Sequence, residues 1–279
     1  MSYNVVDMTQ NLLFSLSALF SLVPASILTW RRGPERDRLF WVLLLVAMAG
    51  PLVWAFIQVA GAWHAGLSTA LWVTIAATMV IFVALSLKTR SAWRLSPVLF
   101  PYLVLIATLA TLALEAPQPL VRGDAPRVWL QVHILVSVTT YALVTLASVA
   151  ALAAFLQERA LKKKRPTTLT RSLPPMAESE SLQVRLLTAS EIVLGLGLLT
   201  GMAVLYYERG HVLALDHKTL LSLATFAVIG VLLTAHAKTG VRGRAAGRLV
   251  LLAYLLLTLA YPGVKFVSDV LIGHPLSGF

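Results

Sequence analysis

Long apolar runs separated by short polar segments occupy most of the chain, and eight such runs can be counted. They cover roughly residues 10–29, 39–59, 67–87, 97–114, 128–157, 184–206, 218–237 and 247–271. An apolar helix of about 20 residues spans the ~30 Å hydrocarbon core of a bilayer. The pattern therefore predicts an all-α, polytopic integral membrane protein with about eight transmembrane helices. The fifth run is longer than a bilayer requires, so its helix should tilt or project beyond the membrane.

Composition supports this fold class and narrows the function. Hydrophobic residues make up 58% of the 279 residues and charged residues 13%, against about 25% charged residues in soluble domains. So little polar chain remains that we expect a single transmembrane domain over residues 1–279. The chain has no cysteine, which excludes disulfides, thiolate metal sites and CxxC redox pairs. No basic segment precedes the first run, so we expect a retained helix and not a cleaved signal peptide.

The basic residues orient the predicted bundle. Four alternate segments, 30–38, 88–96, 158–185 and 238–248, contain 18 of the 23 Lys and Arg residues. Cytoplasmic loops of membrane proteins are enriched in Lys and Arg, so these segments should be cytoplasmic and both termini outside. The same rule explains the net charge of +11 without a nucleic-acid partner. The Lys-Lys-Lys-Arg run inside 158–185 is typical of a solvated cytoplasmic loop, with an anionic lipid or a partner protein as alternatives.

This topology sorts the six histidines between the two membrane faces. Five fall on the outer face and only His236 on the cytoplasmic face; the five are His64, His133, His211, His217 and His274. A helix from His217 to His236 would be about 28 Å long, so these two residues cannot bind the same metal ion. His133 lies inside the fifth run, where an ionisable side chain is costly. It is either hydrogen-bonded to a neighbouring helix or headgroup, or a ligand to a haem iron.

Three charged residues and the tryptophans also have alternative roles. Asp216 precedes the seventh run, where an aspartate caps a helix N-terminus well. Lys265 can extend to the interface or meet an anion inside the bundle. Glu191, well inside the sixth run, is an interhelical partner or a proton or cation site. Most of the tryptophans fall near the ends of runs, which is typical of an interfacial aromatic belt.

Several short stretches in the second half of the chain occur together in one known family. They are Val132–Ser137 with Tyr141–Leu143, Leu173–Met176, Leu198–Gly201, Leu215–Lys218, His236 with Gly240–Arg244, and Ala260–Tyr261 with Gly263–Phe266. In this order and spacing, residues 128–279 resemble the membrane domain of the cytochrome c assembly family of haem-handling proteins, and in particular its YpjD, or CcsA-like, branch. The first half resembles the family more weakly, mainly at His64–Ser68.

The resemblance implies a set of haem-site residues. By it, His133 and His274 are axial ligands of a haem iron at the outer face, and Asp216, His217 and Lys265 line the cavity. His236 is similar to a histidine of a haem site within the membrane, and His64, in the stretch that carries the weaker resemblance of the first half, is included among the haem-site residues.

The resemblance also implies a role. The expected protein is a haem-binding, multi-pass protein of the bacterial inner membrane that acts in cytochrome c maturation or haem delivery. It is a handling protein more than a turnover enzyme. Its expected partners are membrane lipid, other assembly proteins and apocytochrome.

One departure from the family pattern supports a different hypothesis. The family carries a tryptophan-rich segment of the form W-G-x-x-W-x-W-D, but here residues 210–216 contain the aspartate and no tryptophan. A haem-free accessory or ion-transport-related protein on the same scaffold is therefore the alternative, with Glu191 as its residue of interest. Ligase activity on an apocytochrome would need a docking domain from a separate partner.

Overall fold

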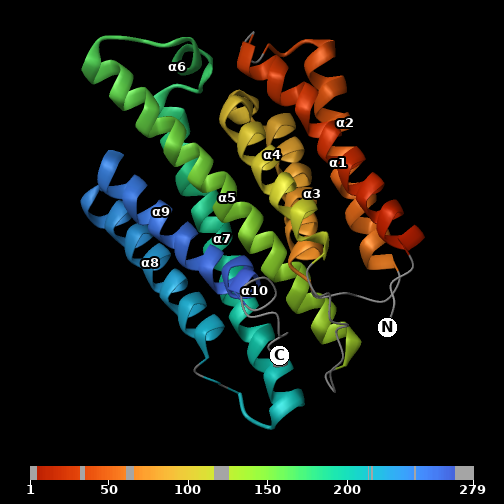
Figure 1. Ribbon diagram of the computed structural model, residues 1–279. Helices are drawn as coiled ribbons and strands as arrows, with labels where there is room; N and C mark the ends of the chain where they lie inside the picture. Colours follow the sequence, from red (N-terminus) through yellow and green to blue (C-terminus); the bar gives the residue numbers. More distant parts are fainter. Residues whose placement is uncertain are drawn as a thin grey trace. The chain divides into compact units, whose positions relative to one another are not determined.

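The computed structural model describes residues 5–31, 35–60, 66–115, 126–212, 214, 216–241 and 243–267, and within these ranges every regular element is a helix. Eight helical segments are long and apolar enough to cross a membrane, which confirms the predicted fold class (Figure 1). The main helices are α1 (Val5–Arg31), α2 (Arg38–Ala60), α3 (Leu67–Lys88), α4 (Ser96–Leu112), α5 (Arg127–Lys163), α7 (Met176–Arg209), α8 (His217–Thr239) and α9 (Gly243–Thr258). Short elements are η1 (Ala92–Leu95), η2 (Ala113–Glu115), α6 (Thr168–Ser172), the π-helical turn η3 (Leu259–Gly263) and α10 (Val264–Phe266).

The helices fall into two compact units, which we describe separately. The first contains α1 to α4 together with the segment that begins at Lys265, and the second contains α5 to α9 and ends its main part at Val264. That the whole chain acts as a single domain stays a prediction.

A buried tryptophan connects three helices in the first unit. Trp72 on α3 is fully buried, and its indole nitrogen donates to the Ser15 hydroxyl of α1 at 3.2 Å. That hydroxyl lies 2.9 Å from the Thr111 hydroxyl of α4. Trp54 on α2 is only 3% exposed and stacks on Phe14. An interfacial belt was the expected role for these tryptophans, and for Trp54 and Trp72 it is wrong because both rings belong to the core.

The two basic segments of the first unit lie at the same end of it. Arg36, between α1 and α2, reaches the Ser86 carbonyl near the C-terminus of α3 at 3.5 Å. Arg36 also lies 5.6 Å from the Trp41 ring centroid, a cation–π arrangement. The alternation of helix directions therefore groups segments 30–38 and 88–96, as the charge pattern predicts. Which membrane face they occupy stays a prediction.

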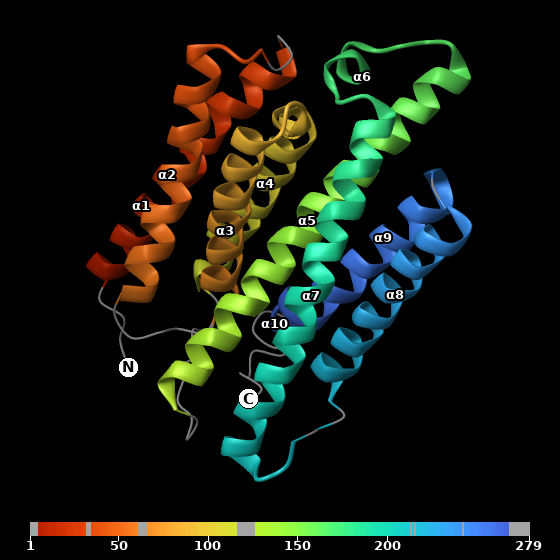
Figure 2. The ribbon, with the colours of Figure 1, turned by 180° about the vertical axis from the view of Figure 1, so that it is seen from behind.

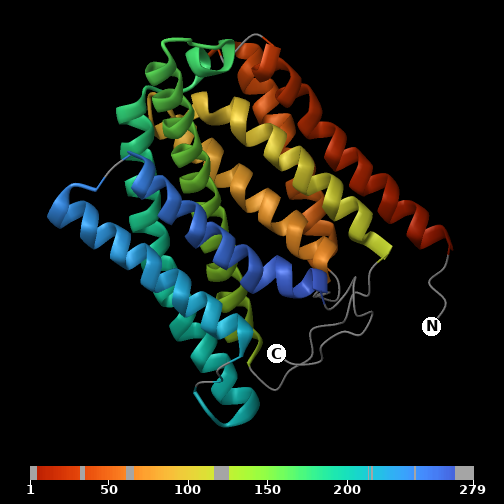
Figure 3. The ribbon, with the colours of Figure 1, turned by 60° about the vertical axis from the view of Figure 1, so that its left-hand side comes forward.

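The second unit is built around α5 and α7, which run antiparallel and pack along most of their length (Figure 2). Alanines and other small residues fill the buried face of α5, including Ala142, Ala147, Ala150 and Ala153, which permits close helix approach. α9 packs against α5 and α8, and α8 also packs against α7 (Figure 3).

Helices α5 and α7 are longer than their apolar runs. They contain 37 and 34 residues, so each is about 50 Å long or more, well beyond a ~30 Å hydrocarbon core. The long connection expected over 158–183 is therefore shorter, because α5 continues to Lys163 and α7 begins at Met176. Gln157 holds this connection: its side-chain amide donates to the carbonyls of Thr170 at 2.7 Å and Pro174 at 3.1 Å.

Candidate functional site

The second unit places the sequence-predicted residues at two opposite ends. The N-terminal part of α5, the C-terminal part of α7 and the start of α8 lie together at one end (Figures 1 and 2). This end holds His133, Asp216 and His217. The other end holds the C-terminus of α8 with His236. The structure thus separates His236 from the other three, as the topology predicted.

A hydrogen bond to the next helix fixes the ring of His133. Its Nδ1 lies 3.1 Å from the Thr200 hydroxyl of α7. That hydroxyl has one proton, and it donates to the carbonyls of Leu196 at 3.0 Å and Gly197 at 3.1 Å. The hydroxyl therefore accepts from His133, so the hydrogen-bond network assigns the ring proton to Nδ1. Nε2 then keeps its lone pair, the form in which imidazole binds a metal ion.

Gly201 leaves room beside the same ring. A Cβ atom at this position would lie 3.0 Å from Cε1 of His133 and 3.8 Å from Nε2. The first distance is closer than side chains normally pack, so any larger residue at 201 would displace the ring. Thr200 and Gly201 together position and accommodate the imidazole. A histidine held by a hydrogen bond at Nδ1 fits an imidazole ligand of a haem iron.

Asp216 caps α8, as expected. Its carboxylate accepts from the backbone N–H of Thr219 at 2.8 Å. The next residue, His217, is exposed at the first turn of α8. Lys218 follows it in the same turn of α8.

His236 has a similar arrangement at the opposite end of the unit. Its Nδ1 lies 3.0 Å from the carbonyl oxygen of Val241. A carbonyl only accepts, so Nδ1 carries the proton and Nε2 is left with its lone pair. Among the residues that the structure describes, no group of three His, Cys, Asp or Glu side chains could hold a metal ion.

The structure says less about the remaining residues that the sequence analysis singled out. His64 and His274 lie outside the described residues. Lys265 in α10 is buried, with 8% of its surface exposed. Glu191 on α7 faces α8, where a Cβ at Gly230 would come within 3.1 Å of its Oε1. Its Oε2 is buried and has no hydrogen-bond partner among the described residues.

Two residues of the site had no role assigned from the sequence. Thr200 and Gly201 occur in a stretch that carries the family resemblance, but nothing in a single sequence pairs them with His133, 67 residues earlier. The available signal was a hydroxyl next to a glycine inside an otherwise apolar run. Thr200 and Gly201 contact His133 only because α5 and α7 pack antiparallel in this register, which the sequence does not show.

At least eight helices long and apolar enough to cross a membrane define a polytopic membrane protein. The chain belongs to the cytochrome c assembly protein family, whose model matches residues 38–272. This membership places it in cytochrome c biogenesis as a multi-pass membrane protein.

A curated relative supports the same relationship without adding a role. A protein from Azospirillum brasilense, described as an uncharacterized 28.8 kDa protein in the nifR3-like 5′ region, is 65% identical over 271 residues. The match covers 95% of this chain and 100% of the relative. No solved structure matches.

Proposed function

We propose that this protein binds haem at the end of the second unit that contains His133, and that it handles haem during cytochrome c maturation. One observation carries the proposal. His133 Nδ1 is held at 3.1 Å from the Thr200 hydroxyl while its ring packs against Gly201, so Nε2 is the ring nitrogen left for a metal ligand bond. In known haem proteins the N–H of the iron-bound histidine is held in the same way by a hydrogen bond.

The remaining roles extend the family resemblance to this chain. His133 and His274 would be the axial ligands, with Asp216, His217, Lys265 and His64 around the bound haem. His236 would serve a separate haem position at the opposite end. Haem supplies redox chemistry to the cytochrome that receives it, and this chain's part is to bind, orient and shield the cargo.

The proposed setting follows from charge and family. The basic ends of both units would face the cytoplasm, so that both termini and His133 lie on the outer side of a bacterial inner membrane. Within the family we assign the chain to the YpjD, or CcsA-like, branch. Other assembly proteins and apocytochrome are the proposed partners.

A haem-free accessory or ion-transport role is the second candidate. The segment before Asp216 contains no tryptophan, and the Glu191 carboxyl has a buried oxygen without a hydrogen-bond partner among the described residues. Both observations favour a scaffold that has lost its cofactor. Haem content distinguishes the two candidates.

The test is an absorption spectrum of the detergent-purified full chain, expressed in haem-replete cells, in oxidised and reduced form. We expect a Soret band that His133→Ala largely removes and Thr200→Val weakens. His211→Ala, which alters an exposed histidine, serves as the matched control and should leave the band unchanged. Added imidazole should restore the band to His133→Gly, because a small ligand replaces the lost donor. A colourless wild type, or a wild-type spectrum in His133→Ala, would refute the haem proposal.

A further inference from the structure

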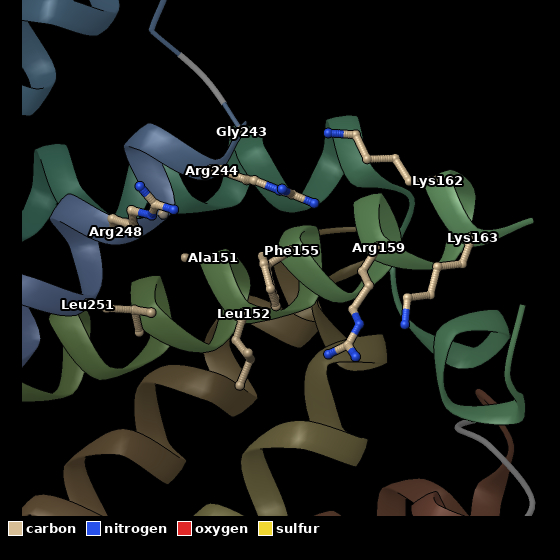
Figure 4. A pocket seen from close by; sticks show the side chains of 11 residues that line it. Ala151, Leu152, Phe155, Arg159, Lys162, Lys163, Gly243, Arg244, Arg248 and Leu251 are labelled. Carbon is tan, nitrogen blue, oxygen red and sulfur yellow. The ribbon is translucent and has the colours of Figure 1, made fainter. Parts of the chain in front are cut away.

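A basic cavity lies between α5 and α9, at the end of the second unit opposite His133. Its volume is about 650 Å³, within the range of small-molecule sites. Five cations line it: Arg159, Lys162 and Lys163 from α5, and Arg244 and Arg248 from α9. Figure 4 shows their side chains spread around the cavity, with Lys162 and Arg244 extending beside each other. Five positive charges around one cavity favour the binding of an anion.

Part of this charge is already balanced. Glu158 forms an ion pair with Lys162 on its own helix and with Arg244 across the cavity, at 3.2 Å from Nε. Glu180 also approaches this region, where it accepts from the backbone N–H of Gly243 at 3.0 Å. Within the described part of the chain, Arg159, Lys163 and Arg248 have no acidic side chain at salt-bridge distance. These three cations remain available to a ligand.

The lining changes from basic to apolar along both helices. On α5 the cations at 159–163 are followed, one to two turns towards the middle of the helix, by Phe155, Leu152 and Ala151. On α9, Arg244 and Arg248 are followed by Leu251. Phe155, Leu152 and Leu251 are exposed, as expected of side chains that contact acyl chains. A phospholipid has the same order of charge and hydrocarbon along its length.

The depth of the cations also matches a lipid headgroup. Arg244 and Arg248 are the second and sixth residues of the membrane-crossing segment Gly243–Phe266. At 1.5 Å per residue, they lie about 2 to 8 Å from its start, close to the expected level of the phosphates. Gly247 keeps the space open between them, since a Cβ there would meet no atom within 4 Å.

We propose that this cavity binds the phosphate of an anionic phospholipid, with the acyl chains lying along Phe155, Leu152 and Leu251. Basic pockets between transmembrane helices bind such headgroups in other proteins. The proposal is independent of haem, because it uses the opposite end of the unit. It also gives the basic residues at the C-terminal end of α5 a role beyond orientation in the membrane.

The test is lipid retention by the purified full chain, measured by native mass spectrometry with phosphatidylglycerol, cardiolipin or phosphatidylcholine. We expect the two anionic lipids to be retained at least tenfold better than phosphatidylcholine. Arg159→Gln with Arg248→Gln should lower that retention at least tenfold, about fivefold for each cation removed. Arg165→Gln with Lys238→Gln is the matched control, because it removes two exposed cations of the same basic end that do not line the cavity.

A steric variant separates the cavity from general charge. Gly247→Trp keeps every cation, fills the space and should lower retention as much as the double arginine variant, while Gly247→Ala should not. Gly247→Trp also tests the proposal if the double arginine variant fails to fold. Equal retention of phosphatidylcholine, or an equal loss in the control pair, would overturn the proposal. Displacement of the lipid by millimolar inorganic phosphate would identify a soluble phosphate as the ligand and refute the lipid assignment.

Discussion

Substitution of Gly201 by alanine tests the packing of the proposed haem site. The new Cβ would lie 3.0 Å from Cε1 and 3.5 Å from Nδ1 of His133. The contact with Cε1 is tighter than side chains normally make, so the imidazole must shift by a few tenths of an ångström. Gly197→Ala is the matched control: it lies one turn earlier on α7 and faces the same helix, but its Cβ would be an ordinary 3.4 Å from Val136.

The expected stabilities follow from two opposing effects. Alanine is favoured over glycine inside a helix by about 1 kcal/mol, and this gain applies to both variants. Overpacking costs about 1–3 kcal/mol, and this cost applies only at position 201. Gly197→Ala should therefore raise the melting temperature by a few degrees, and Gly201→Ala should leave it unchanged or lower it.

Thermal unfolding in detergent, followed by tryptophan fluorescence, measures this difference. The Soret absorbance of the same preparations reports the site. Gly201→Ala should reduce haem content because the displaced ring loses its hydrogen bond to Thr200, whereas Gly197→Ala should retain it. The reasoning is refuted if both variants gain the same stability and keep the same haem content.

Three other contacts of the second unit give predictions that can be measured in the same preparations. Tyr141→Phe removes bonds to the hydroxyls of Tyr254 at 3.3 Å and Thr258 at 3.1 Å. At about 0.6 kcal/mol for each bond in a membrane, the free energy of unfolding should fall by about 1 kcal/mol, and an unchanged melting temperature would contradict the network. Gln157→Glu sets a carboxylate against the backbone carbonyls that the amide now binds, so trypsin should cut the connection between α5 and α7 faster, and an unchanged digestion rate would show that this contact does not hold it. Glu191→Leu removes a buried oxygen without a partner among the described residues, and its melting temperature should stay equal or rise; a clear fall would mean that Glu191 has a stabilising partner.

Features that depend on a single helix or a single connection could be predicted from the sequence. A run of apolar residues specifies a membrane helix because the bilayer leaves few other structures possible, so the eight spans are correct. Asp216 was recognisable as a cap because capping involves only its own helix. The basic segments share ends within each unit because short connections reverse the direction of the chain at every helix.

The sequence analysis did not predict features that depend on how two helices pack against each other. The length of α7 was underestimated because its first turns contain Glu178 and Glu180, which end the apolar run without ending the helix. Trp72 was expected at an interface because its position along α3 is visible in the sequence and its burial by α1 and α4 is not. The pairing of His133 with Thr200 depends on the register of α5 against α7, which no local pattern specifies.

The two ends of the second unit are suited to different ligands. At one end, the imidazole of His133 is held by a hydroxyl and packs against a glycine, the contacts on which the proposed haem site rests. At the other end, guanidinium and ammonium groups line an open cavity above apolar side chains, which favours an anionic amphiphile. His217 and His236, at the two ends of α8, are about 28 Å apart along the helix, so the haem iron and the lipid phosphate would occupy separate sites. A lipid bound between α5 and α9 would instead stabilise the contact between these helices, and α5 is the helix that carries His133.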